Sequence, residues 1–334
     1  MLVRMPRKSF SVVLDHSHGE LLNLADEEFR PFGRLLEQMN CALTVHNSGK
    51  ITGDILSDAD LLIVGCPINH YFLYDEISDI TDFVINGGCL LIASEYGGDS
   101  VQKTNLNDLT KNFGLYFENT AIRTKDDTGS TSLPLITKVI NHDITKGIRK
   151  IMLGGTCTIR TAKNAYGICM SGPETWVEIY DDLNNMWIEH DDHDIPLIAA
   201  NTYGQGRIVA MGDIDIFGNN PRFGLASLDN QKLIENIFSW FDQPVRSDIT
   251  IEWILHQIAN YREDISQLTG NFKNLVESVQ SLEERISSLE ETQDDIYDSL
   301  SKLWSAFRQE HEIELKEIVE EDSDKKKAAL AKKH

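Results

Sequence analysis

The sequence predicts an α/β protein built on a mostly parallel sheet, followed by a long C-terminal helix that forms a coiled coil. Three observations support this fold class. Short β-branched apolar runs alternate with helical patterns from Phe10 to about Phe241, as in chains whose crossover helices cover both faces of a parallel sheet. Between Leu115 and Tyr180 the runs shorten and alternate in polarity, which predicts a β-rich extension. From Ile251 the apolar residues recur every seven positions, which is typical of a coiled coil.

The elements of the first half alternate between strand and helix. SFSVVLD at 9–15 predicts a strand, and apolar residues at helical spacing predict a helix over 26–39. CALTVH at 41–46 and the continuous apolar run at 61–65 predict the next two strands. The apolar face of 75–86 predicts a second helix, which the glycine pair after it would end.

The elements of the second half return to the same sheet. CLLIAS at 89–94 predicts a buried strand, and 106–113 predicts a helix. PLIAAN at 196–201 and RIVAMGD at 207–213 predict two strands joined by a YGQG turn, which together indicate a hairpin. The apolar stripe of 229–241 predicts the last helix of this domain.

Charge and composition exclude several classes of partner. The 334 residues carry a net charge of −22, so the surface would repel phosphates and anionic lipids, and we expect no nucleic-acid partner. The sequence has no run of eighteen apolar residues, and no apolar segment follows the basic residues at its start. We therefore expect neither membrane insertion nor export.

The cysteines indicate a reducing compartment. Their number is odd, and none of them has CxxC spacing. Because most lie in apolar runs, we expect buried reduced thiols in a cytoplasmic protein, and neither a disulfide framework nor a zinc finger. The cysteines are Cys41, Cys66, Cys89, Cys157 and Cys169.

The heptad pattern of the C-terminal region predicts a helix that pairs with another chain. The pattern continues to Phe307 and passes Gly270 without a change of phase, so we do not expect an internal hairpin. A helix of this length extends about 85 Å, too far to pack on one small domain. The core positions expected to hold the oligomer include Ile251, Ile258, Ile265, Leu268, Leu275, Leu282, Leu289, Gln293, Leu300 and Leu303.

The residue types at the core positions favour a parallel dimer. Isoleucine and valine dominate the first heptad position and leucine dominates the fourth, and Gln293 is the polar exception that can fix the register. Charge selects the partner only weakly, since Arg285 with Glu290 of the other chain is the one complementary flanking pair. Trp304 and other apolar residues beside the core leave a higher oligomer or a hetero coiled coil open.

These patterns divide the chain into four parts. We expect an α/β domain at 1–244, a linker at 245–250 and a coiled-coil helix at 251–310. The remaining residues, 311–334, are first acidic and then basic, and we expect a solvated, disordered tail.

Polar loops follow the predicted parallel strands. In an open parallel sheet, ligands bind beyond the carboxyl ends of the strands, so we expect these loops to form a cleft for a partner or a polar ligand. The side chains expected to line it are Asp15, His18, Glu20, Asn69, Glu95, Asp213, Asp215 and Asn219.

Three segments of the same region resemble a known family. GCPIN after 61–65, EYGGD after the strand at 89–94, and YGQGRIVAMGDIDIFGNN followed by DNQKLIENIFSWF are similar to a class I glutamine-amidotransferase-like domain. This domain is shared by an intraflagellar-transport complex B subunit, gliding-motility ABC-transport accessory proteins and uncharacterised archaeal and bacterial proteins. The resemblance covers about Phe10 to Phe241 and implies a flavodoxin/amidotransferase-like fold.

The resemblance does not imply amidotransferase activity. In catalytic relatives a cysteine nucleophile stands on the sharp turn after the strand equivalent to CLLIAS, whereas here that turn offers Glu95, Tyr96 and Gly97. Cys66 is the nearest rival nucleophile. Because it precedes Pro67 rather than a helix amino terminus that would lower its pKa, we expect a structural role for it.

Metal, cofactor and acid–base sites are not expected either. Residues 15–20 and 189–194 supply histidines and carboxylates, but neither spacing matches a known set of metal ligands. No phosphate-binding glycine motif is complete, so no cofactor is expected. Asp213 and Asp215 would point to opposite faces of a strand, which favours a turn cap or a ligand hydrogen bond over an acid–base pair.

The sequence therefore favours a non-catalytic scaffold, in which the head recognises a protein or polar ligand and the coiled coil drives oligomerisation. One alternative is a hydrolase acting on a carbohydrate or an amide, with Glu95 or Asp213 as the base and His18 as its partner. Another alternative is a soluble accessory subunit of an ABC-type transport system, as the gliding-motility relatives imply.

Overall fold

The computed structural model describes residues 9–126, 129–243 and 249–331. The chain divides into two compact units, Met1–Leu255 and His256–His334. Most of the linker expected at 245–250 lies outside the described residues. Among those residues, no helix has the length and apolar character that are needed to cross a bilayer.

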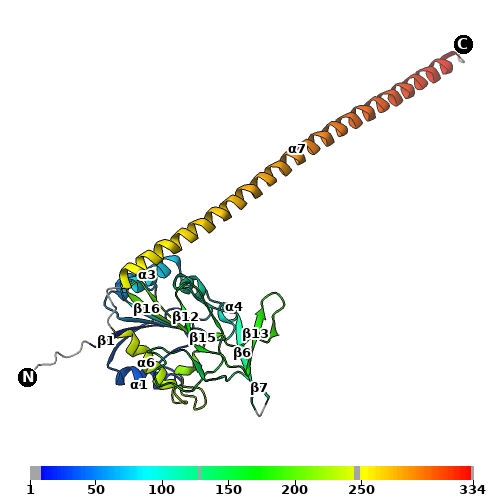
Figure 1. The fold of residues 1–334 in the computed structure, drawn as a ribbon. Helices are drawn as coiled ribbons and strands as arrows, with labels where there is room; N and C mark the ends of the chain where they lie inside the picture. Colours follow the sequence, from blue (N-terminus) through cyan, green and yellow to red (C-terminus); the bar gives the residue numbers. More distant parts are fainter. Residues whose placement is uncertain (1–8, 127–128, 244–248, 332–334) are drawn as a thin grey trace, which may run out of the picture. The chain divides into compact units, whose positions relative to one another are not determined.

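Parallel strands form one half of an eight-stranded sheet (Figure 1). β1 (Phe10–Asp15) lies between β2 (Cys41–His46) and β3 (Leu61–Gly65), and β3 pairs with β4 (Cys89–Ala93). In the order β2-β1-β3-β4 the chain first builds outward on one side of β1 and then crosses to the other side. The sheet therefore has a topological switch point between β1 and β3.

The rest of the sheet contains one more parallel strand, β16 (Gly206–Met211), followed by antiparallel pairings. β16 runs parallel to β4 and antiparallel to β15 (Pro196–Tyr203), which confirms the predicted hairpin. β12 (Tyr166–Met170) and β9 (Lys138–Val139) complete the sheet as antiparallel strands.

Helices cover both faces of the sheet, as predicted. α1 (Arg30–Gln38) and α6 (Asn230–Phe241) pack on one face, and α3 (Tyr74–Ile85) and α5 (Leu106–Thr110) pack on the other (Figure 1). A 3₁₀ turn, η1 (Lys111–Phe113), follows α5.

Two apolar cores result, one on each face of the sheet. Because side chains alternate along a strand, Val12 and Leu14 of β1 enter the core that contains Phe32 of α1. Val13 enters the other core, which contains Ile80 of α3. The completely apolar strand β3 is buried on both faces, as expected of a central parallel strand.

Two features of the helices differ from the sequence prediction. α1 begins at Arg30 rather than at residue 26, because Pro31 occupies its first turn, where a proline is tolerated. α2 (Gly53–Leu56) and α4 (Gly98–Gln102) were not predicted, since they are too short to show helical periodicity.

The β-rich extension is present and is antiparallel throughout. Its main sheet has the order β14 (Met186–His190), β13 (Thr175–Asp181), β6 (Thr120–Asp126) and β7 (Gly129–Thr131). Two small ribbons accompany this sheet. They pair β5 (Leu115–Phe117) with β11 (Ile159–Thr161), and β8 (Leu135–Ile136) with β10 (Ile151–Met152).

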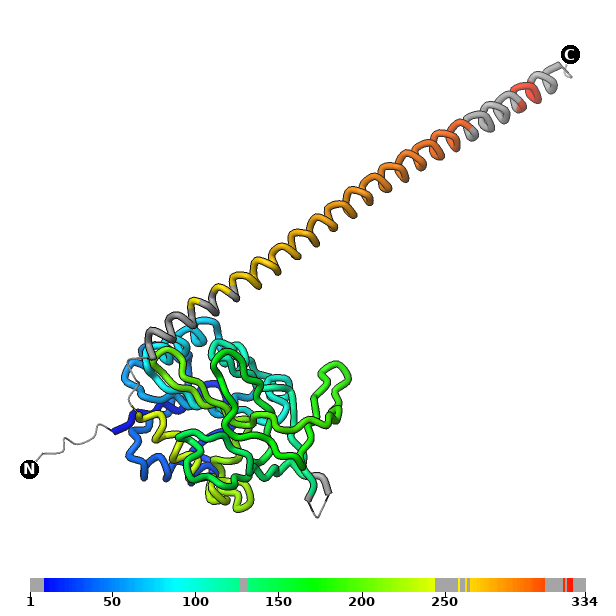
Figure 2. The backbone as a smooth tube through the Cα atoms, in the orientation of Figure 1, coloured from blue at the N-terminus to red at the C-terminus, as the bar shows by residue number. Residues whose placement is uncertain are grey.

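The described residues of the second unit all belong to the long helix α7 (Ile249–Ala331), whose coloured stretch is drawn as an uninterrupted coil in Figure 2. The side chains of Ile251, Ile254 and Tyr261 lie outside the described residues. All described apolar side chains at the first and fourth heptad positions are between 46% and 68% exposed. They are Ile258, Ile265, Leu268, Phe272, Leu275, Val279, Leu282, Ile286, Leu289, Ile296, Leu300, Leu303 and Phe307.

The helix continues well beyond the heptad pattern. Residues 311–331 are helical, whereas the charge blocks of the sequence predicted a disordered tail there. Opposite charges four residues apart help to account for the difference, because they lie on one face of a helix. Glu321 and Lys325 form such a pair, at 3.2 Å.

Candidate functional site

The predicted cleft residues lie at the carboxyl ends of four neighbouring strands, β1, β3, β4 and β16. Their exit loops bring ionisable side chains together in two separate clusters rather than in one cleft.

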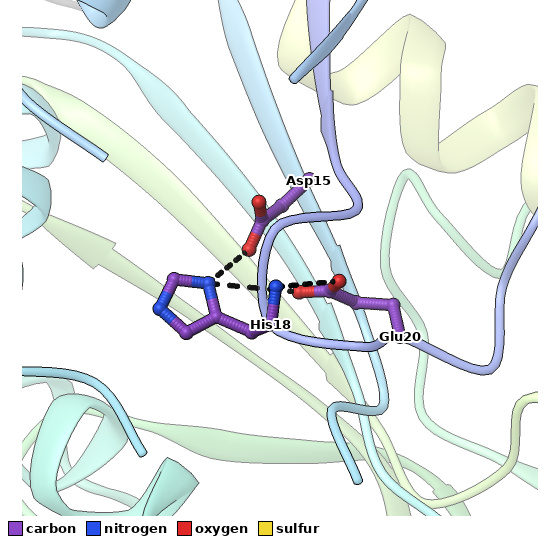
Figure 3. Close-up of side chains that lie close together, drawn as sticks. All are labelled: Asp15, His18 and Glu20. Atoms are coloured by element: carbon purple, nitrogen blue, oxygen red, sulfur yellow. Dashed lines mark hydrogen bonds and ion pairs between the residues drawn. The ribbon is translucent and has the colours of Figure 1, made fainter. Parts of the chain in front are cut away.

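The first cluster consists of Asp15, the last residue of β1, together with His18 and Glu20 from the loop that follows (Figure 3). Nδ1 of His18 lies 2.7 Å from Oδ2 of Asp15 and 3.9 Å from Oε1 of Glu20. The backbone N–H of His18 donates to Oε2 of Glu20 at 3.1 Å. All three residues are buried, with exposed fractions of 0%, 6% and 8%.

Neighbouring groups hold this cluster in place. Ser17 donates its backbone N–H and its hydroxyl to Oδ1 of Asp15, at 2.9 and 2.7 Å. On the other side of the imidazole, Oε1 of Glu76 lies 3.2 Å from Nε2 of His18. The ring of Phe72 stacks on the same imidazole, with centroids 4.1 Å apart.

Glu76 is a site residue that the sequence analysis missed. It belongs to α3, where its carboxylate accepts the backbone N–H groups of Ile51 and Leu73, each at 2.9 Å. The second of these bonds is a helix cap, so the sequence signal for Glu76 was that of a capping residue. Nothing in the local sequence connects it with His18.

Burial and mutual contact separate the pKa values in the first cluster. Burial raises the pKa of Glu20 to about 9, and the adjacent Asp15 adds to this effect. Burial also favours the neutral form of Asp15, but hydrogen bonds with His18, Glu20 and Ser17 outweigh it and lower the pKa of Asp15 to about 2. Burial likewise disfavours the charged imidazole, but Asp15 and Glu76 outweigh it and raise the pKa of His18.

The second cluster consists of Glu95, which follows β4, and Asp213 and Asp215, which follow β16. One carboxylate oxygen of each lies within 4.8 Å of the other two. Asp213 accepts the N–H of Gly154 at 2.9 Å and that of Asp215 at 2.8 Å. The expectation that Asp213 and Asp215 point apart was wrong, because the strand ends at Met211.

The carboxylate of Asp213 accepts the N–H of Asp215, the first residue of the 3₁₀ turn η2 (Asp215–Phe217), which is the kind of contact that a turn cap makes. Burial also raises the pKa values of this cluster. It raises the pKa of Glu95 well above its usual range, and the charges of Asp213 and Asp215 add to this effect. The pKa of Asp213 rises to about 8, through burial first and Asp215 second. Burial and the charge of Glu28 raise the pKa of Asp215.

The structure separates several residues that the sequence placed in one cleft. His18 contacts Asp15, Glu20 and Glu76, and among the described residues no hydrogen bond or ion pair joins it to Glu95. Asn69 and Asn219 are exposed and bond to backbone carbonyls, the first through its N–H to Gln102 and the second through its side chain to Glu27. The pairing of Glu95 with His18 in the hydrolase alternative therefore lacks geometric support.

None of the five thiols has a lowered pKa. Burial raises the pKa of Cys41 to about 11 and those of Cys89 and Cys169 to about 12. It raises the pKa values of Cys66 and Cys157 further. Because a thiolate is the nucleophilic form, the structural role expected for Cys66 fits its complete burial.

Comparisons with known proteins support the fold. Residues 11–169 match the model of the IFT52 GIFT domain. The mmIFT52 N-terminal domain superposes with a TM-score of 0.58 at 18% identity, over 69% of this chain and 96% of that chain. A putative ThuA-like protein from Bacteroides uniformis gives a TM-score of 0.46 at 14% identity, over 71% of this chain and 93% of that chain. No curated protein matches the sequence.

These matches confirm the predicted α/β fold and the predicted resemblance. The family match ends at residue 169, before the YGQGRIVAMGDIDIFGNN segment that carried much of the resemblance in the sequence.

Proposed function

We propose that this protein is a non-catalytic scaffold, whose α/β head binds a protein partner and whose helix α7 pairs with α7 of a second copy. The observation that carries the proposal is the continuous apolar face of α7, which is exposed over the described residues from Ile258 to Phe307. The similarity of the head to the IFT52 GIFT domain supports a scaffold role for the whole chain.

The exit of β4 supports a head that does not use thiol chemistry. Glu95, Tyr96 and Gly97 occupy the turn where a catalytic amidotransferase would carry its cysteine. The two thiols on which the charge of Glu95 acts, Cys66 and Cys157, are both completely buried, and burial raises the pKa of each.

The exposed apolar side chains of α7 must be buried against a partner. Each large apolar side chain left in water forfeits roughly 1.5–3 kcal/mol relative to full burial. Helix propensity contributes only tenths of a kcal/mol per residue, so propensity cannot compensate for a stripe of this length. A partner helix that buries the stripe removes this cost.

A second copy in parallel orientation fits the stripe. β-Branched residues at the first heptad position with leucine at the fourth favour two parallel strands. In this arrangement Arg285 faces Glu290 of the second copy, and none of the flanking positions brings two like charges together. Gln293 would then face its counterpart and oppose a shift of register.

The oligomeric state tests the proposal. We expect sedimentation equilibrium of the full chain to give a dimer. Leu282→Asp places a charge at a core position of the coiled coil, and we expect this variant to be a monomer. Ser281→Asp is the matched control, because it adds the same charge one residue away, outside the core positions, and should leave the dimer intact. A monomeric full chain, or a dimer that persists in Leu282→Asp, would contradict the pairing.

An acid–base enzyme is the second candidate. The observation that favours it is the second cluster, in which burial holds carboxylic acids protonated near neutral pH; such shifts are frequent at catalytic sites. A hydrolase screen of the wild type and Glu95→Gln tests it. Activity that is lost in Glu95→Gln would support this candidate, and inactivity of the wild type towards glycosides and amides would reject it.

A further inference from the structure

The first cluster occupies the position in the sheet where ligands of open α/β folds bind. Asp15 ends β1, and the loop from Asp15 to Glu20 crosses towards the exit of β3, where Glu20 forms a bridge with Pro67. This is the switch point between β1 and β3, and crevices at switch points are the usual binding sites in such sheets.

Three possible ligand atoms of the first cluster lie close together (Figure 3). One carboxylate oxygen of Asp15, one ring nitrogen of His18 and one carboxylate oxygen of Glu20 all lie within 4.8 Å of one another. Nδ1 of His18 is 2.7 Å from Oδ2 of Asp15 and 3.9 Å from Oε1 of Glu20. Oε1 of Glu20 has no hydrogen-bond partner among the described residues, although the residue is only 8% exposed. A buried carboxylate oxygen without a donor costs free energy unless a cation or a proton reaches it.

The remaining atoms of the same side chains are anchored elsewhere. Ser17 occupies Oδ1 of Asp15 with two hydrogen bonds, and the backbone N–H of His18 occupies Oε2 of Glu20. Glu76 faces Nε2 of His18 and is itself fixed by two backbone donors. Each of the three cluster residues therefore has one polar atom that a neighbouring group fixes, and a second polar atom that lies close to the other two residues of the cluster.

We propose that Asp15, His18 and Glu20 bind one divalent transition-metal ion through Oδ2, Nδ1 and Oε1, with Glu76 as the positioning residue for the imidazole. Ligands about 2.1 Å from an ion lie about 3.0–3.4 Å from one another. The Asp15–His18 distance of 2.7 Å and the His18–Glu20 distance of 3.9 Å lie on either side of that range. Small side-chain rotations would bring the three atoms around one ion.

The donor set indicates the class of ion. One imidazole with two carboxylates suits Zn²⁺, Mn²⁺ or Fe²⁺ better than Ca²⁺ or Mg²⁺, which prefer oxygen ligands throughout. Metal-bound histidines characteristically donate their other ring N–H to a carboxylate, which fixes the tautomer. Glu76 supplies that carboxylate, and its place on α3 would tie the metal loop to the helix layer.

Metal titration of the full chain tests the site. After EDTA treatment and dialysis, we expect calorimetry with ZnCl₂ or MnCl₂ to show one ion per chain. Glu20→Gln should weaken binding at least about 100-fold, because it replaces one of three ligands, an anionic carboxylate, with a neutral amide. Glu76→Gln should weaken it about 10- to 100-fold, as outer-shell changes do. In ¹⁵N spectra of the imidazole, Zn²⁺ should shift Nδ1 of His18 more than Nε2.

Asp215→Asn is the matched control, because it removes a carboxylate from the second cluster, and it should leave the affinity unchanged. Circular dichroism of the metal-free variants establishes that they are folded. A wild type that takes up neither ion, affinity that survives Glu20→Gln in a folded protein, or affinity that is lost in Asp215→Asn would each overturn the proposal.

Discussion

At the scale of single residues, Glu20 shows what burial does to a carboxylate that has a carboxylate neighbour. Its pKa is raised to about 9 while that of Asp15 is lowered to about 2, so in the metal-free protein one proton serves both groups at neutral pH. Ser17 and His18 donate to Asp15, which therefore retains its charge more readily than Glu20 does.

The stability of the metal-free protein should therefore depend on the ionisation of Glu20. An unfolded glutamate titrates near pH 4.3, so the folded state binds the Glu20 proton more tightly. The stabilisation is full below about pH 4 and is lost progressively as the pH rises towards about 9. We expect Glu20→Gln, which cannot ionise, to gain stability relative to the wild type across this window, by at most about 1.4 kcal/mol per pH unit.

Urea unfolding of both proteins in EDTA at several pH values between 5 and 8 measures this difference. Asp15, His18 and Glu76 face the site in both proteins, so their own titration largely cancels in the comparison. Parallel pH dependence of the two proteins would show that Glu20 is already ionised in the folded state.

The sequence identified all six residues of the two clusters, five of them by their type and their position after strands, and Asp15 by its place at the end of β1 itself. It could not show that they separate into two clusters, because that depends on how far each loop travels after its strand. The error over Asp213 and Asp215 has the same origin, since two residues alternate across a sheet only while the strand continues. The sequence could not identify Glu76 as a site residue, because α3 brings it to His18 from a distant part of the sequence.

At the scale of elements, Gly212 determines how β16 passes into the second cluster. A Cβ at this position would lie 2.2 Å from the backbone oxygen of Cys157, and backbone cannot move aside as a flexible side chain can. We expect Gly212→Ala to lower the free energy of unfolding by about 1–3 kcal/mol, the usual cost of overpacking. Chemical denaturation measures the change.

Gly53→Ala is the corresponding control, because a Cβ there meets nothing within 4 Å. It should leave stability unchanged or raise it by about 0.4–1 kcal/mol, through a smaller entropy of the unfolded chain. Equal losses of unfolding free energy in both variants would mean that the contact with the backbone of Cys157 does not restrict the side chain at position 212.

Long periodic elements were predicted more reliably than short ones. The continuous apolar strands β3 and β4 and the amphipathic helices α3 and α6 agree with the sequence to within one or two residues. The extension between Leu115 and Tyr180 could only be described as antiparallel, since its strands are mostly two to seven residues long and pair over long separations. Their order is a property of the tertiary structure.

At the scale of the whole molecule, the net charge opposes the pairing that the heptads favour. Each copy carries −22, so two copies repel each other, and the flanking pair of Arg285 with Glu290 contributes at most a few tenths of a kcal/mol in return. Apolar burial along α7 exceeds this gain many times over. Apolar burial along α7 therefore stabilises the proposed dimer, and the net charge of the two copies destabilises it.

Salt should strengthen such a dimer. Raising NaCl from about 20 mM to about 300 mM shortens the screening length from about 20 Å to about 6 Å, which reduces the repulsion between the copies. We expect the dissociation constant from sedimentation equilibrium to fall by about tenfold, while Leu282→Asp stays monomeric throughout. A dissociation constant that rises with salt would mean that complementary charges between the two copies drive the association, and would contradict a dimer that apolar burial stabilises and net charge destabilises.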